Sequence, residues 1–198
     1  MSSLAGLIKK LWRGNRNSEA KCFRENQACE GAFDHIDRGI CSVPLEQIVG
    51  SVGRYHDFDS QFKIKDHVPP DRLISVKQAM REGKSLPPVK LYQIKDEYYV
   101  LDGNHRIAAA KELGRRHIEA DIVEFIPSRD TLENLLYRER SEFFEKTGLS
   151  ASIRWTEVGQ YAHLVEQIGH HRDFLERTCG KAVTVPHAAR DWHQTIFS

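Results

Sequence analysis

Short apolar runs and stretches with apolar residues at helical spacing alternate through the middle of the chain. The runs predict strands, and they lie at 40–43, 89–94, 98–101 and 118–125. The helical spacing predicts helices at 71–82 and 104–113, each followed by a glycine that would end it. Lys95-Asp96 predicts a hairpin turn, and Pro44 marks the start of a further helix that includes Ile48. The pattern predicts a small α/β domain with a mixed sheet.

The last third of the chain carries helical spacing alone. Helices are predicted at 128–147, ended by Gly148, at 156–177 and at 187–197. Their apolar stripes are more typical of a core than of ligand sites. Without a matching pair of carboxylates, the histidines of the second helix are interpreted as solvated or capping residues; they are His163, His170 and His171. The sequence therefore divides into an α/β domain at 40–126 and a helical region at 127–198.

The first part of the chain, residues 1–39, predicts an amphipathic helix followed by an irregular linker. Residues 3–13 place a row of apolar side chains on one helical face, with basic residues around it. This helix would dock on the protein's own surface, or it would contact a protein partner or an anionic membrane surface. The polar stretch at 14–39 predicts a linker that holds one short helix.

Composition narrows the functional classes. A net charge of +1 over 198 residues does not favour binding to bulk DNA, although a local basic patch is compatible with it. No apolar run has the length of a membrane span and the N-terminus lacks signal-peptide order, so we expect a cytoplasmic protein. The spacing of the four cysteines, Cys22, Cys29, Cys41 and Cys179, favours reduced thiols over a disulfide framework. The alternative is a metal cluster formed by the first three cysteines with a histidine.

The strand that ends at Leu101 runs directly into Asp102-Gly103-Asn104-His105-Arg106, which opens the Ala-rich helix. At such a turn Asp102 can accept bonds from backbone N–H groups, while Gly103 and Asn104 tolerate unusual backbone geometry. His105 and Arg106 fall in the first helical turn, beside unpaired N–H groups and the positive end of the helix dipole. An arginine fork there would make a receptor for phosphate or carboxylate. The alternative is that Asp102 and Asn104 cap the helix and Arg106 is a solvated surface residue.

Four motifs occur in order around this turn. They are Val43-Pro44-Leu45-Glu46-Gln47-Ile48, Leu86-Pro87-Pro88-Val89-Lys90-Leu91-Tyr92, the D-G-N-H-R turn and the A-A-x-x-L-G end of the helix. In their order and spacing, residues 40–124 resemble the ParB/sulfiredoxin superfamily. The resemblance implies a small α/β domain that binds nucleotide phosphates at the turn. Members use it for CTP hydrolysis, ATP-dependent sulfinic acid reduction, serine phosphorylation and reported nuclease activity, so the fold alone does not select the reaction.

Departures from the family patterns narrow the choice. Sulfiredoxins carry a reactive cysteine immediately before the His-Arg pair, where this chain has Asn104. Partitioning CTPases have a Glu-Arg-Arg turn and a following helix-turn-helix, and this sequence shows neither. The free-serine kinases resemble the turn more closely, but the position of their catalytic glutamate falls near Val52.

The stretch from Gly50 to Asp59 predicts a long polar loop, and loops of this kind are often functional. The resemblance implies that it faces the phosphate site. Arg54 would then be a second anion contact, and Asp57 or Asp59 would be a Mg²⁺ ligand or general base. The alternative is a surface loop whose aspartates satisfy turns.

Two hypotheses of different class follow. In the first, the chain is an enzyme, a nucleotide hydrolase or phosphotransferase or a Mg²⁺-dependent nuclease, in which residues 102–106 hold phosphate and His105 is a further candidate acid or base. In the second, it is a non-catalytic module that senses ATP or CTP and engages a protein partner through its terminal helices. The missing glutamate and cysteine favour the second, and the acidic loop favours the first. The sequence favours a nucleotide-binding protein, with a ParB-like nuclease or DNA-associated protein as the alternative.

Overall fold

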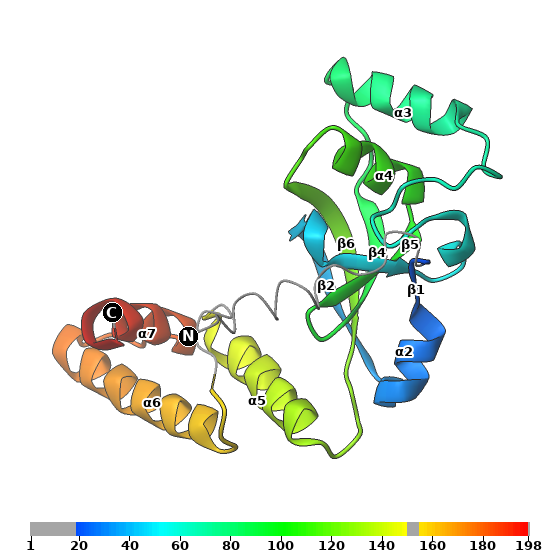
Figure 1. The fold of residues 1–198 in the computed structure, drawn as a ribbon. Helices are drawn as coiled ribbons and strands as arrows, with labels where there is room; N and C mark the ends of the chain where they lie inside the picture. The colour runs from blue at the N-terminus through cyan, green and yellow to red at the C-terminus, as the bar shows by residue number, and fades with distance from the viewer. Residues whose placement is uncertain (1–18, 150–154, 198) are drawn as a thin grey trace, which may run out of the picture. The chain divides into compact units, whose positions relative to one another are not determined.

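A computed structural model describes residues 19–149 and 155–197 of the chain. The chain divides into two compact units between Pro127 and Ser128 (Figure 1). The amphipathic helix predicted at 3–13 lies outside the described residues.

The first unit is built on a six-stranded mixed sheet in the order β1-β3-β5-β4-β6-β2. The strands are β1 (Lys21–Cys22), β2 (His35–Pro44), β3 (Ile48–Ser51), β4 (Val89–Ile94), β5 (Glu97–Asp102) and β6 (His117–Phe125). Strands β4 and β5 form the predicted antiparallel hairpin, with Lys95 in the left-handed region at its turn. β3 pairs parallel to β5 on one side, and β6 pairs parallel to β4 on the other. The predicted mixed α/β architecture is confirmed.

Each face of the sheet is covered by different helices (Figure 1). Leu91 and Val100 point to the face that packs against α3 (Asp71–Arg81) and α4 (Asn104–Glu112). Their chain neighbours Tyr92 and Tyr99 point to the other face, where Phe23 of α2 (Phe23–Glu30) covers them. Successive side chains of a strand alternate between faces, so both faces of the central strands are buried.

The prediction of a helix starting at Pro44 is wrong. Leu45–Gln47 form a single 3₁₀ turn, η1, and Ile48 begins strand β3. Parallel pairing with β5 buries Ile48 and overrides the helix-start signal of the proline. Gly50 makes this pairing possible, because a Cβ there would lie 2.2 Å from the carbonyl oxygen of Lys21.

The stretch expected to be a linker is more ordered than its polarity suggested. It contains β1 and α2, and β2 begins at His35, before the predicted start near Ile40. The nine-pair ladder between β2 and β6 recruits this polar segment into the sheet. Phe23 at the start of α2 and Ala32 just after its end are buried and hold the helix in place. The polarity of the segment did not indicate this burial.

The second unit contains α5 (Leu132–Thr147), α6 (Gln160–Cys179) and α7 (Val185–Trp192), which continues as a π-helical turn, η3 (His193–Phe197). Its core includes Phe143, Ile168 and Trp192, so the predicted apolar stripes do form a core. His171 is not solvated, because its side chain is 11% exposed and its Nε2 lies 2.7 Å from Asp191 Oδ2. In the described parts of the chain, no helix combines the length and apolar character of a membrane span.

Candidate functional site

The turn between β5 and α4 begins a helix whose first residues, Asn104 and His105, are buried. Gly103 has φ +104°, and a Cβ there would lie 2.6 Å from Val89 Cγ1, so the turn requires glycine. The Ile107 N–H donates to the Gly103 carbonyl at 2.9 Å, which begins the helical ladder. The N–H groups before it have no acceptor within the helix, and they lie at the positive end of its dipole. The predicted strand-to-helix turn is confirmed.

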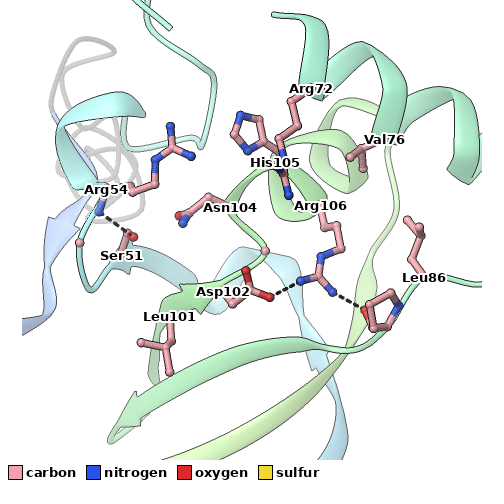
Figure 2. A pocket seen from close by; sticks show the side chains of 13 residues that line it. Ser51, Arg54, Arg72, Val76, Leu86, Leu101, Asp102, Asn104, His105 and Arg106 are labelled. Atoms are coloured by element: carbon pink, nitrogen blue, oxygen red, sulfur yellow. Dashed lines mark hydrogen bonds and ion pairs between the residues drawn. The ribbon is translucent and has the colours of Figure 1, made fainter. Parts of the chain in front are cut away.

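A cavity of about 500 Å³ opens over this helix start. Its walls come from the end of β3, the loop after it, α3, the segment before β4, and the β5–α4 turn (Figure 2). The lining residues are Ser51, Gly53, Arg54, Arg72, Val76, Leu86, Pro87, Leu101, Asp102, Gly103, Asn104, His105 and Arg106. The fold therefore brings Arg54 together with all five residues of the turn.

Arg106 acts as a clamp within the protein. Its Nη2 donates to Asp102 Oδ2 at 2.5 Å, as Figure 2 shows. Its Nη1 donates to the Pro88 carbonyl at 3.0 Å and to the Pro87 carbonyl. The side chain is only 13% exposed. The fork proposed from the sequence as the anion receptor thus ties the first turn of α4 to the segment that leads into β4.

Arg72 is the cation that sequence reasoning did not identify. It lies in the first turn of α3, is exposed and lines the cavity. Within the described part of the chain, its guanidinium makes no hydrogen bond or ion pair. An arginine on a helix surface is ordinarily solvated, so only the packing of α3 beside α4 reveals its place.

Arg54 is held in the cavity wall by its own loop. Its Nε donates to Asp57 Oδ2 at 2.6 Å, and its backbone N–H donates to the buried Ser51 hydroxyl at 3.2 Å. Burial raises the pKa of Asp57, but Arg54 and His67 outweigh it and hold that pKa below its ordinary value. Asp59 accepts the backbone N–H groups of Gln61 and Lys63 at 2.8 and 2.9 Å. Asp57 and Asp59 both lie outside the cavity lining.

Asn104 and His105 are both 7% exposed, at the start of α4. The Asn104 Oδ1 is buried and has no hydrogen-bond partner among the described residues. The His105 ring meets Phe58 edge-on, with 5.9 Å between ring centroids. Burial lowers the pKa of His105, and the charges of Arg54 and Arg72 lower it further against the opposing charge of Asp57. Both effects favour the neutral imidazole.

The described residues do not form a cage for a metal ion. No group of three His, Cys, Asp or Glu side chains comes together among them, and the four cysteines are free thiols. Asp102 is the acidic residue in the cavity lining, and its carboxylate already binds Arg106. Mg²⁺ binds through one or two carboxylates together with substrate phosphates, so these residues could hold it only together with a phosphate ligand.

The residues that line the cavity from Arg72 to Arg106, which include the turn, fall within a recognised domain. Residues 56–138 match the ParB N-terminal domain. The resemblance to the ParB/sulfiredoxin superfamily predicted from the motifs is confirmed. The ParB N-terminal match begins after β3 and runs into α5, so it includes α3, α4 and the turn but not Arg54.

Solved structures with a similar fold include a sulfiredoxin and two ParB proteins. Sulfiredoxin from Arabidopsis thaliana is 20% identical, with 42% of this chain and 82% of that chain covered and a TM-score of 0.34. The chromosome-partitioning protein ParB from Caulobacter crescentus, solved with CTP-γ-S, is 15% identical, with coverages of 71% and 64% and a TM-score of 0.33. A pNOB8-like ParB N-domain is 14% identical, with coverages of 74% and 44% and a TM-score of 0.32. The comparison with curated protein sequences found no match.

Proposed function

We propose that this chain binds the phosphate groups of a nucleotide, ATP or CTP, in the cavity at the start of α4. One observation carries the proposal: Arg72 and Arg54 reach the same helix N-terminus from separate elements, and Arg72 has no partner among the described residues. A helix N-terminus alone contributes roughly 0.3–1 kcal/mol to anion binding. Two guanidinium groups beside it would add charge-assisted hydrogen bonds to the phosphate, which strengthen this weak preference for an anion.

The rest of the cavity suits the remainder of a nucleotide. Its volume of about 500 Å³ falls within the range of small-molecule sites. Val76, Leu86 and Leu101 add apolar wall beside the charged end. A ligand with one polyanionic end and one flat apolar end matches this division.

The proposal concerns binding, and phosphoryl transfer is a separate hypothesis. The assignment of Asp57 or Asp59 as metal ligand or general base stays a prediction. Against it, Asp57 orients Arg54 and Asp59 closes a turn. His105 does line the cavity, so it is the better placed of the three predicted catalytic residues.

Titration calorimetry with ATP, ADP, CTP and GTP, with and without Mg²⁺, tests binding. Arg72→Gln and Arg54→Gln should each weaken binding about 10- to 100-fold, the loss expected for one charge-assisted hydrogen bond. Arg24→Gln is the matched control, because Arg24 is exposed on α2 and lies outside the cavity lining. Absence of binding by every nucleotide, or equal affinities of the Arg72 and Arg24 variants, would refute the proposal.

Product analysis of the bound nucleotide then separates a module from an enzyme. A module releases its nucleotide intact, whereas an enzyme converts it and loses this activity in Asp57→Asn or Asp59→Asn. Cleavage of a labelled oligonucleotide without nucleotide turnover would instead favour the nuclease alternative.

A further inference from the structure

We propose that His105 takes up a proton when an anion enters the cavity, so that the site selects a doubly charged terminal phosphate over an internal phosphodiester. This inference rests on the proposed function and names the chemical class of its ligand. It assigns His105 a role in specificity that requires no bond in the ligand to break.

The surroundings of His105 leave its ring available to a ligand. His105 is 7% exposed and lines the cavity, and its ring nitrogens make no hydrogen bond to a described residue. The ring packs edge-on against Phe58, which positions it without using a nitrogen. A ring nitrogen that reaches the cavity without a protein partner can form a hydrogen bond with a ligand there.

The charges that face His105 come from every element around it. Arg72 reaches it from α3, Arg54 and Asp57 from the loop after β3, and the remaining pair in the lining, Asp102 and Arg106, neutralise each other. Arg54 is partly compensated by Asp57, but Arg72 is not compensated. The local field is therefore positive, and together with burial it favours the neutral imidazole in the empty site.

An anion in the same cavity reverses this field. A negative charge within hydrogen-bonding distance favours the imidazolium, which then donates a hydrogen bond to the anion. The proton comes from solvent, and the ligand keeps its covalent structure. A terminal phosphate carries about −1.5 to −2 charges at neutral pH, whereas an internal diester carries a single charge. The terminal group gains more from a third cation.

Calorimetry with inorganic sulfate tests proton uptake, because sulfate keeps its charge across neutral pH. Titrations of the full chain near pH 7 in two buffers of different ionisation enthalpy give the number of protons bound per sulfate. Wild type should take up close to one proton, His105→Gln none, and the control His35→Gln the wild-type number. His35 is exposed on β2 and lies outside the cavity lining. In the window between the pKa of His105 in the empty and in the occupied site, sulfate affinity should fall about tenfold for each unit rise in pH.

Two further measurements follow the histidine itself and the choice of ligand. NMR titration of ¹³C-labelled histidine should show the pKa of His105 rising when sulfate is added. A nucleoside 5′-monophosphate should bind at least about tenfold more tightly than its 3′,5′-cyclic form, and His105→Gln should reduce this preference.

The outcomes separate the two claims. Sulfate or nucleotide binding without proton uptake overturns the role of His105 and leaves the phosphate site in place. Equal affinities for the monoester and the cyclic diester overturn the selectivity. Binding of neither sulfate nor any nucleotide overturns the proposed function and this inference with it.

Discussion

Arg106→Ala should destabilise the first unit, because Arg106 holds the start of α4 to the segment before β4. The substitution removes donors to the Pro87 and Pro88 carbonyls and to Asp102. Hydrogen bonds that involve a charged group contribute about 1.5–3 kcal/mol each. The Asp102 side chain is 65% exposed, so solvent screening reduces that pair to about 0–1 kcal/mol. The bonds to the two neighbouring carbonyls share one nitrogen, and together we expect a loss of about 2–4 kcal/mol.

Hydrogen exchange without ligand locates this loss within the chain. In Arg106→Ala, amides of α4 and β4 should exchange faster than in wild type, and urea unfolding should show the reduced stability. Arg72→Gln should change unfolding by less than about 0.5 kcal/mol, as expected for an exposed residue without partners. It should nevertheless weaken nucleotide binding. A wild-type stability of Arg106→Ala combined with lost binding would show that Arg106 is the anion fork after all.

Three further substitutions test strand packing, a buried lysine and a hydrogen bond between helices. Gly50→Ala should cost at least about 2 kcal/mol in denaturant unfolding because its Cβ would collide with β1 and the Tyr99 ring, while Gly53→Ala, with open space around its Cβ, should be neutral. Burial lowers the pKa of Lys111 to about 8, so the folded state loses this proton before the unfolded state does. Wild-type stability should therefore rise between about pH 8 and pH 10, by up to roughly 3 kcal/mol relative to Lys111→Met, and parallel pH profiles of the two proteins would contradict this. His171→Ala should cost about 1–2 kcal/mol through its lost bond to α7, measured by tryptophan fluorescence; His170→Ala, at an exposed position, should behave as wild type.

Elements whose signals are local could be predicted from the sequence. The β4–β5 hairpin and the turn into α4 follow from apolar runs, a tight turn and Gly103, all within a few residues of one another. Strand β3 could not be predicted in this way, because its pairing with β5 joins segments far apart in the chain. The proline at its start indicated a helix instead. The short strand β1 likewise exists only through its partner β3.

The site follows the same division between local and distant causes. All five residues of the turn motif line the cavity. The motif did not predict which residues face a ligand: Arg106 and Asp102 bind each other, and Arg72 comes from a helix that shares no motif with the turn. Residue type alone does not show whether a guanidinium already has a protein partner.

The packed turn and the charged side chains of the cavity contribute differently to ligand specificity. The frame of the cavity is the β5–α4 turn, whose Gly103 and Arg106 are fixed by packing against Val89 and the Pro87–Pro88 carbonyls. Arg54 and Arg72 lie in the segment between β3 and β4, which also supplies Phe58, Phe62, Leu73 and Met80 to the core. Exchanging the exposed residues of 52–86 while keeping these core residues should therefore alter which anion binds, whereas exchanging the turn should unfold the domain. If the chain kept its original ligand preference after the exchange of exposed residues, specificity would lie in the turn itself.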